Sequence, residues 1–154
     1  AVSRATLPVF SRAHAKGAGH LNRMAMHWAQ LLFGLGIVAL VFGWLLAPLA
    51  VRIVFERGAF TASNSAAVAE VLRYAMFQVP FYFSGLVFVS LVSSRRNYTI
   101  LAVAAVLGLV AKLTANAVLV PWLGLNGLAL ANASLYGTTT LFLAAFTVSK
   151  WQRK

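Results

Sequence analysis

The sequence predicts an all-α integral membrane protein with four membrane-spanning helices, on the basis of its composition, its long uncharged runs and the placement of its charges. Of its 154 residues, 61% are hydrophobic and only 10% are charged, and its mean hydropathy is +0.83. A soluble domain carries about a quarter charged residues because its surface must be solvated, whereas a lipid-facing surface needs none. The composition therefore excludes an ordinary soluble domain.

Four apolar runs are long enough to cross a bilayer, which takes about 20 helical residues. Each run must be helical, because backbone donors and acceptors cannot be left unpaired in lipid. Pro80 interrupts the second run, and Pro121 to Gly127 predicts a tight turn between the last two. The expected spans are 28–52, 68–94, 98–120 and 125–148. The remaining segments are expected to be the end of a preceding transmembrane helix (1–11), a cytoplasmic loop (12–27), a periplasmic loop (53–67) and a cytoplasmic tail (149–154).

The distribution of positive charge predicts the orientation. One side of this topology carries nine basic residues: Arg4, Arg12, Lys16, Arg23, Arg95, Arg96, Lys150, Arg153 and Lys154. The other side has Arg52 and Arg57, partly offset by Glu56. Cytoplasmic loops are the ones enriched in Lys and Arg, so both ends should be cytoplasmic, in a multi-pass protein of the bacterial inner membrane. The same rule accounts for the net charge of +11, and no nucleic-acid partner is expected.

The side chains needed for catalysis or metal binding are scarce. There is no cysteine, and the two carboxylates, Glu56 and Glu70, are far apart in the predicted topology. His14, His20 and His27 are six and seven residues apart, whereas helical metal ligands are usually three or four apart. We therefore expect neither an enzyme nor a bound cofactor.

Lys112 is the most informative single residue, because it lies near the middle of the third span. A charge at that depth must face protein or a watery cavity, and Asn116 lies one turn further on the same face. The pair would then line a cavity that attracts an anionic headgroup, and Arg4 is a further candidate. The alternative is a lysine whose ammonium snorkels to the interface. Glu70 and Arg73, three residues apart, are expected to pair on their helix.

A turn-forming segment, FERGAFT, follows the first span. It precedes Ser63, Asn64 and Ser65, which are good N-cap residues for the next helix. Physical reasoning assigns it to an outer-face turn in which Gly58 permits the reversal. The segment also resembles the F-x-x-G-x-F-T loop that follows the ninth span in the MurJ/MviN family of lipid II flippases. Phe55, Gly58, Phe60 and Thr61 match the pattern, and Arg57 is included with them in the outer-loop motif.

Two further motifs resemble the same family in the same order. Leu7 to Arg12 (LPVFSR) is similar to the L-P-x-x-S that ends the family's eighth span. Asn116 and the following LVPWLGLNGLALA match its N-x-x-L-x-P-x-x-G-x-x-G-L-A-x-A pattern across spans eleven and twelve. The stretch from Ser90 to Thr99 departs from the family, which usually has an F-Y-A-x-x-D-like stretch and a proline there.

The resemblance implies four helices of the C-terminal lobe of a MurJ-like transporter in the multidrug/oligosaccharidyl-lipid/polysaccharide exporter superfamily. The chain would then be a fragment of a flippase that moves lipid II, an undecaprenyl-pyrophosphate-linked peptidoglycan precursor, across the inner membrane by alternating access. Its expected partners are membrane lipids, this lipid-linked glycan and the remaining helices of the parent transporter. Two alternatives stay open: a flippase for another lipid-linked polysaccharide unit, such as O-antigen or exopolysaccharide, and a noncatalytic membrane subunit.

Overall fold

The structure, a computed structural model, describes residues 18–55 and 62–151, and these residues form five helices. The helices are α2 (Ala18–Phe55), α3 (Ala62–Met76), α4 (Val79–Ser94), α5 (Tyr98–Leu123) and α6 (Leu125–Trp151). Because α3 and α4 form one interrupted span, the helices make four apolar segments long enough to cross a membrane. The prediction of an all-helical protein with four long apolar segments is confirmed.

The first helix is longer than the span expected from the sequence. It begins at Ala18, so residues 18–27 of the range expected to be a loop, 12–27, are helical. Leu21, Ala25 and Ala29 follow one another at four-residue spacing and are all buried, so the apolar stripe of the helix continues past Arg23. A charge marks where a helix leaves lipid, whereas its backbone hydrogen bonds can continue into water.

Pro80 breaks the second span. α3 ends at Met76, Phe77 and Gln78 form a turn, and α4 begins at Val79 with Pro80 in its first turn. Proline is well tolerated there because the first N–H groups of a helix have no intrahelical acceptor. The interruption therefore yields two shorter helices that follow each other in one span.

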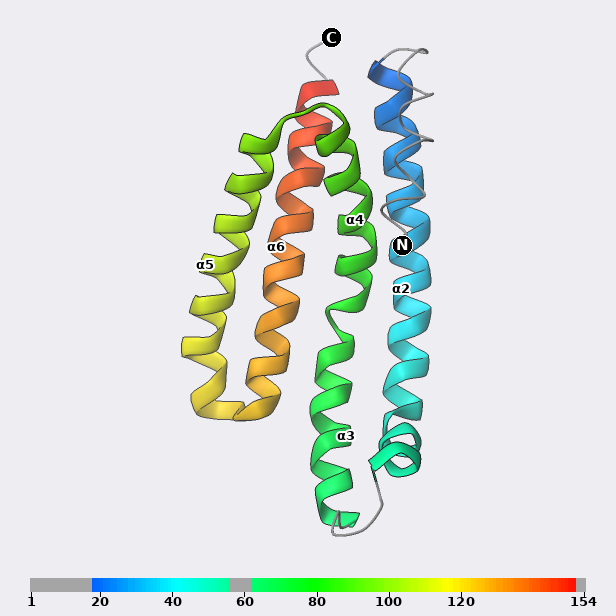
Figure 1. Cartoon of the computed structure of the whole chain (residues 1–154), viewed down its shortest axis with the longest axis vertical. Helices are drawn as coiled ribbons and strands as arrows, with labels where there is room; N and C mark the ends of the chain where they lie inside the picture. The colour runs from blue at the N-terminus through cyan, green and yellow to red at the C-terminus, as the bar shows by residue number, and fades with distance from the viewer. Residues whose placement is uncertain (1–17, 56–61, 152–154) are drawn as a thin grey trace.

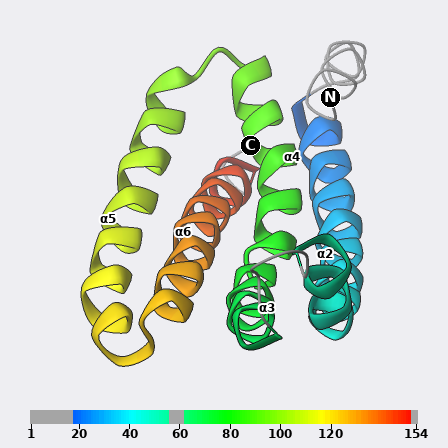
Figure 2. The same ribbon diagram turned by 60° about the horizontal axis from the view of Figure 1, so that its bottom comes forward.

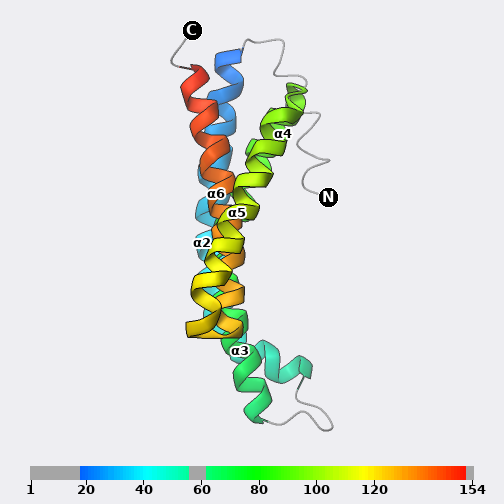
Figure 3. The ribbon, with the colours of Figure 1, turned by 90° about the vertical axis from the view of Figure 1, so that its left-hand side faces the viewer.

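The helices are arranged approximately as a row, in the order α5, α6, α3 with α4, and α2 (Figure 1). The turn between α5 and α6 lies beside α3, so the first part of α3 and the end of α2 project beyond it (Figures 1 and 3). Viewed with the lower end brought forward, α6 lies between α5 and α4 (Figure 2). Large apolar side chains remain exposed on α2 and α5, including Leu45, Phe42 and Val106, as expected for surfaces that face lipid or other helices.

Small residues bring α5 and α6 together. Ala104 and Gly108 are buried on α5, and a Cβ at Gly108 would lie 2.3 Å from Oγ1 of Thr139 on α6. Gly124, the single residue between the two helices, has a positive φ of 55°, which glycine adopts without a Cβ clash. On α6, by contrast, Gly137 faces Phe81 of α4 rather than α5. A small residue of α6 therefore also allows α4 to pack against this helix.

Candidate functional site

The candidate headgroup residues lie on α5, on the side that packs against α6. Gly108, Lys112 and Asn116 follow at four-residue spacing, and both polar side chains are half-buried. Their neighbours Leu109, Val110 and Leu113 are each more than half exposed. Lys112 therefore lies on the boundary between the apolar outer face of α5 and its packed face.

Asn116 adds an unusual feature to this pair. Its Oδ1 atom is buried and has no hydrogen-bond partner, although the helix around it is otherwise regular. A buried acceptor without a donor costs about 1–3 kcal/mol. An arrangement in which another polar group reaches Oδ1 would remove this cost, and the charged neighbour one turn away is a donor with three N–H groups.

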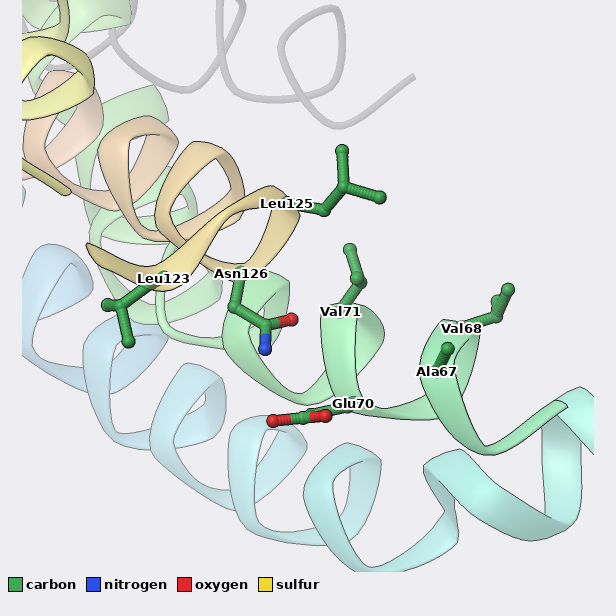
Figure 4. A pocket seen from close by; sticks show the side chains of 7 residues that line it. All are labelled: Ala67, Val68, Glu70, Val71, Leu123, Leu125 and Asn126. Carbon is green, nitrogen blue, oxygen red and sulfur yellow. The ribbon is translucent and has the colours of Figure 1, made fainter. Parts of the chain in front are cut away.

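Two pockets open on the described part of the bundle. The first, of about 400 Å³, is formed by α3 and the α5–α6 turn. Glu70 and Asn126 project from the two sides of this pocket among apolar side chains (Figure 4). The second, of about 440 Å³, lies between α2, α4 and α6, and its lining includes Phe33, Phe81 and Leu141. Neither of these two pockets is lined by Lys112 or Asn116.

Arg73 does not behave as the sequence suggested. Its Nε donates a hydrogen bond to the backbone carbonyl of Trp44 on α2, at 3.2 Å, and its guanidinium carbon lies 5.9 Å from the centre of the Trp44 ring. The interaction therefore joins α3 to α2, across 29 residues of sequence, instead of joining Arg73 to Glu70 within α3.

A second polar contact joins α2 to the α4–α5 connection at the opposite end of the bundle. Nη2 of Arg95 donates a short hydrogen bond to Oδ1 of Asn22, whose side chain is 5% exposed. Burial lowers the pKa of Arg95 from its ordinary value, because desolvation disfavours the charged form. Neither residue was predicted as a site residue from the sequence, where Arg95 was counted only among the basic residues that set the orientation.

Several predicted site residues fall outside the described residues. These are Arg4 and four residues of the outer-loop motif: Arg57, Gly58, Phe60 and Thr61. Phe55 is the last residue of α2 and is 51% exposed. Within the described ranges 18–55 and 62–151, no three His, Cys, Asp or Glu side chains are grouped so that they could hold a metal ion.

Comparison with known proteins gives two matches. A solved structure described as "Lipid II flippase MurJ, inward closed conformation" aligns with a TM-score of 0.81 and 23% sequence identity. The alignment covers 97% of this chain and 31% of that chain, so the fold is shared with about a third of the MurJ structure. A search of curated proteins finds no significant match.

The family comparison extends over almost the whole sequence. The family model described as "Lipid II flippase MurJ" matches residues 1–153, and it therefore includes the segments that carried the resemblance seen in the sequence. With four apolar helices long enough to cross a membrane, the chain belongs to the MurJ family, whose members are multi-pass membrane transporters rather than enzymes.

Proposed function

We propose that the chain forms part of a flippase that moves lipid II across the bacterial inner membrane by alternating access. The match of residues 1–153 to the MurJ family is the observation that carries this proposal. The four spans would belong to the C-terminal lobe, with both ends cytoplasmic, as the basic residues indicate. In such a transporter, one lobe rocks against the other around a central site, and no covalent step is required.

Lys112 and Asn116 are our candidates for contact with the polar headgroup. A pyrophosphate is doubly anionic at least, and a lysine in a low-dielectric setting attracts it far more strongly than in water. The unpartnered Oδ1 of Asn116 would accept a hydrogen bond from a sugar hydroxyl or an amide N–H of the cargo. Both features support a role in binding rather than in packing, because an alanine or leucine would pack here at lower cost.

The proposal is tested by substituting Lys112 in the complete protein. Lys112→Ala should impair growth of a flippase-depleted strain while the protein level stays normal, and Lys112→Arg should restore growth because it keeps the positive charge. Thr114→Ala is a matched control, since the exposed Thr114 hydroxyl bonds to the Val110 carbonyl of its own helix. Normal growth with Lys112→Ala would contradict the headgroup role and favour a snorkelling lysine.

The identity of the cargo needs a separate measurement. Purified protein in vesicles should translocate lipid II faster than an undecaprenyl-linked O-antigen unit. Faster movement of the O-antigen unit would favour the alternative, a flippase for another lipid-linked polysaccharide.

A further inference from the structure

α2 changes direction near its end. Pro48 lies inside this helix, and the last turns of α2 run away from the axis of the preceding part (Figures 1 and 3). Proline is a common cause of such a bend, because its ring clashes with the preceding turn and it has no backbone N–H. The bend thus has an identifiable origin in the sequence.

The missing N–H leaves a particular carbonyl without its usual partner. In an α-helix the N–H of residue i bonds to the carbonyl of residue i−4, so Pro48 deprives the carbonyl of Trp44. In an apolar setting a free carbonyl is costly and is normally satisfied by another group. Arg73 supplies that group, because its Nε donates to this same carbonyl from α3.

The surroundings hold Arg73 and Trp44 in this arrangement. The guanidinium lies over the Trp44 ring at a cation–π distance of 5.9 Å. Tyr74 of α3 and Phe77 of the turn that follows it also contact that ring edge-on, at centroid distances of 6.1 Å and 5.5 Å. Nearby, a Cβ at Gly43 would lie 2.5 Å from Sδ of Met76, so the two helices approach closely at this level.

We propose that Arg73 is a positioning residue that replaces the hydrogen bond removed by Pro48 and thereby fixes the direction of the end of α2. The proposal concerns the geometry of the α2–α3 pair and does not depend on which cargo is moved. The contribution of Arg73 to this geometry should therefore depend on Pro48, because only with proline at position 48 does the Trp44 carbonyl lack its usual donor.

The first test is a double-mutant cycle in the complete protein, measured by denaturant unfolding in detergent. Arg73→Met should raise the unfolding equilibrium constant about tenfold, as expected for loss of a charge-assisted bond. In a Pro48→Ala background, where residue 48 again offers an N–H to Trp44, the same change should raise it less than about threefold. Equal effects in both backgrounds would overturn the proposal.

Tyr74→Leu is the matched control for this cycle. It removes one ring contact with Trp44 but leaves the carbonyl's donor in place. Its effect should therefore be the same in the wild-type background and in the Pro48→Ala background. If Tyr74→Leu couples to Pro48→Ala as strongly as Arg73→Met does, the coupling reflects general packing and the proposal is wrong.

A second test needs no change at Pro48 and stands even if Pro48→Ala fails to fold. Glutamine places its Nε2 as many bonds from the backbone as the Nε of arginine, and methionine places a methyl group there without a donor. Spin labels at Ile53 and Val106, both about 60% exposed, would report the position of the α2 end relative to α5. Arg73→Gln should keep the wild-type distance distribution and Arg73→Met should broaden it. Identical distributions for the two variants would refute the role of the donor.

Discussion

The close backbone contact between α2 and the interrupted span gives a quantitative prediction. An alanine Cβ at Gly36 would lie 2.5 Å from Cα and 3.0 Å from N of Pro80. Carbon atoms in contact are about 3.5–4.0 Å apart, and neither Pro80 atom belongs to a flexible side chain. Gly36→Ala therefore requires α2 to move roughly 1 Å away from the start of α4.

The expected cost follows from two opposing effects. Overpacking in a tight core costs about 1–3 kcal/mol, while replacing glycine by alanine inside a helix contributes up to about 1 kcal/mol of stability. Gly34→Ala isolates the second effect, because a Cβ there meets nothing within 4 Å. The Gly36 variant should thus be about 1–3 kcal/mol less stable than the Gly34 variant.

Denaturant unfolding of the complete protein in detergent measures this difference. Gly43→Ala provides an intermediate case, because its Cβ would meet the movable end of Met76 instead of backbone. Gly34→Ala is expected to be the most stable of the three variants, Gly43→Ala the next and Gly36→Ala the least stable. If Gly36→Ala is as stable as Gly34→Ala, the close approach to Pro80 is not what holds α2 in place.

Two further predictions concern the ends of the bundle. Asn22→Leu should destabilise the protein by about 1–3 kcal/mol, because it leaves the Arg95 guanidinium without its acceptor in a partly buried place. Asn97→Ala serves as the control, since its side chain makes no cap hydrogen bond; equal losses would contradict the reasoning. A cysteine at the exposed Ser63 should react with an impermeant thiol reagent in intact cells stripped of their outer membrane. Labelling only after lysis would reverse the proposed orientation.

Much of the fold was predictable because lipid imposes simple requirements on sequence. An apolar run of sufficient length must be a helix in lipid, so the four spans followed from the lengths of the apolar runs and from the turn at Pro121 to Gly127. The ends of the helices were less predictable. Proline and glycine suggested that the third span ends near Val120, but α5 continues through Pro121 to Leu123. A proline removes one hydrogen bond without necessarily ending a helix, and here the chain reverses only at Gly124.

The candidate site was predictable only in part, for a related reason. The depth of Lys112 follows from counting residues along a span, whereas the unpartnered Oδ1 of Asn116 depends on how α5 packs. Likewise, Arg73 has an obvious neighbour in sequence, Glu70, but its acceptor is 29 residues away on α2. A signal did exist, since Pro48 follows Trp44 by four residues and predicts a free carbonyl. What sequence alone could not provide was the helix that brings a donor to it.

The two halves of the bundle are held together in physically different ways. α5 and α6 meet along a continuous close-packed face, on which Gly108 contacts α6 and Gly127 contacts α5. α2 and the α3–α4 span also pack along a long apolar face, and two irregular points lie on it: the Pro80 break opposite Gly36, and the Pro48 bend, where Arg73 donates to the Trp44 carbonyl. Packing spread over many small contacts tolerates the loss of any one. A directional hydrogen bond such as the one from Arg73 has no such substitute, so its loss should change the geometry of the α2–α3 end.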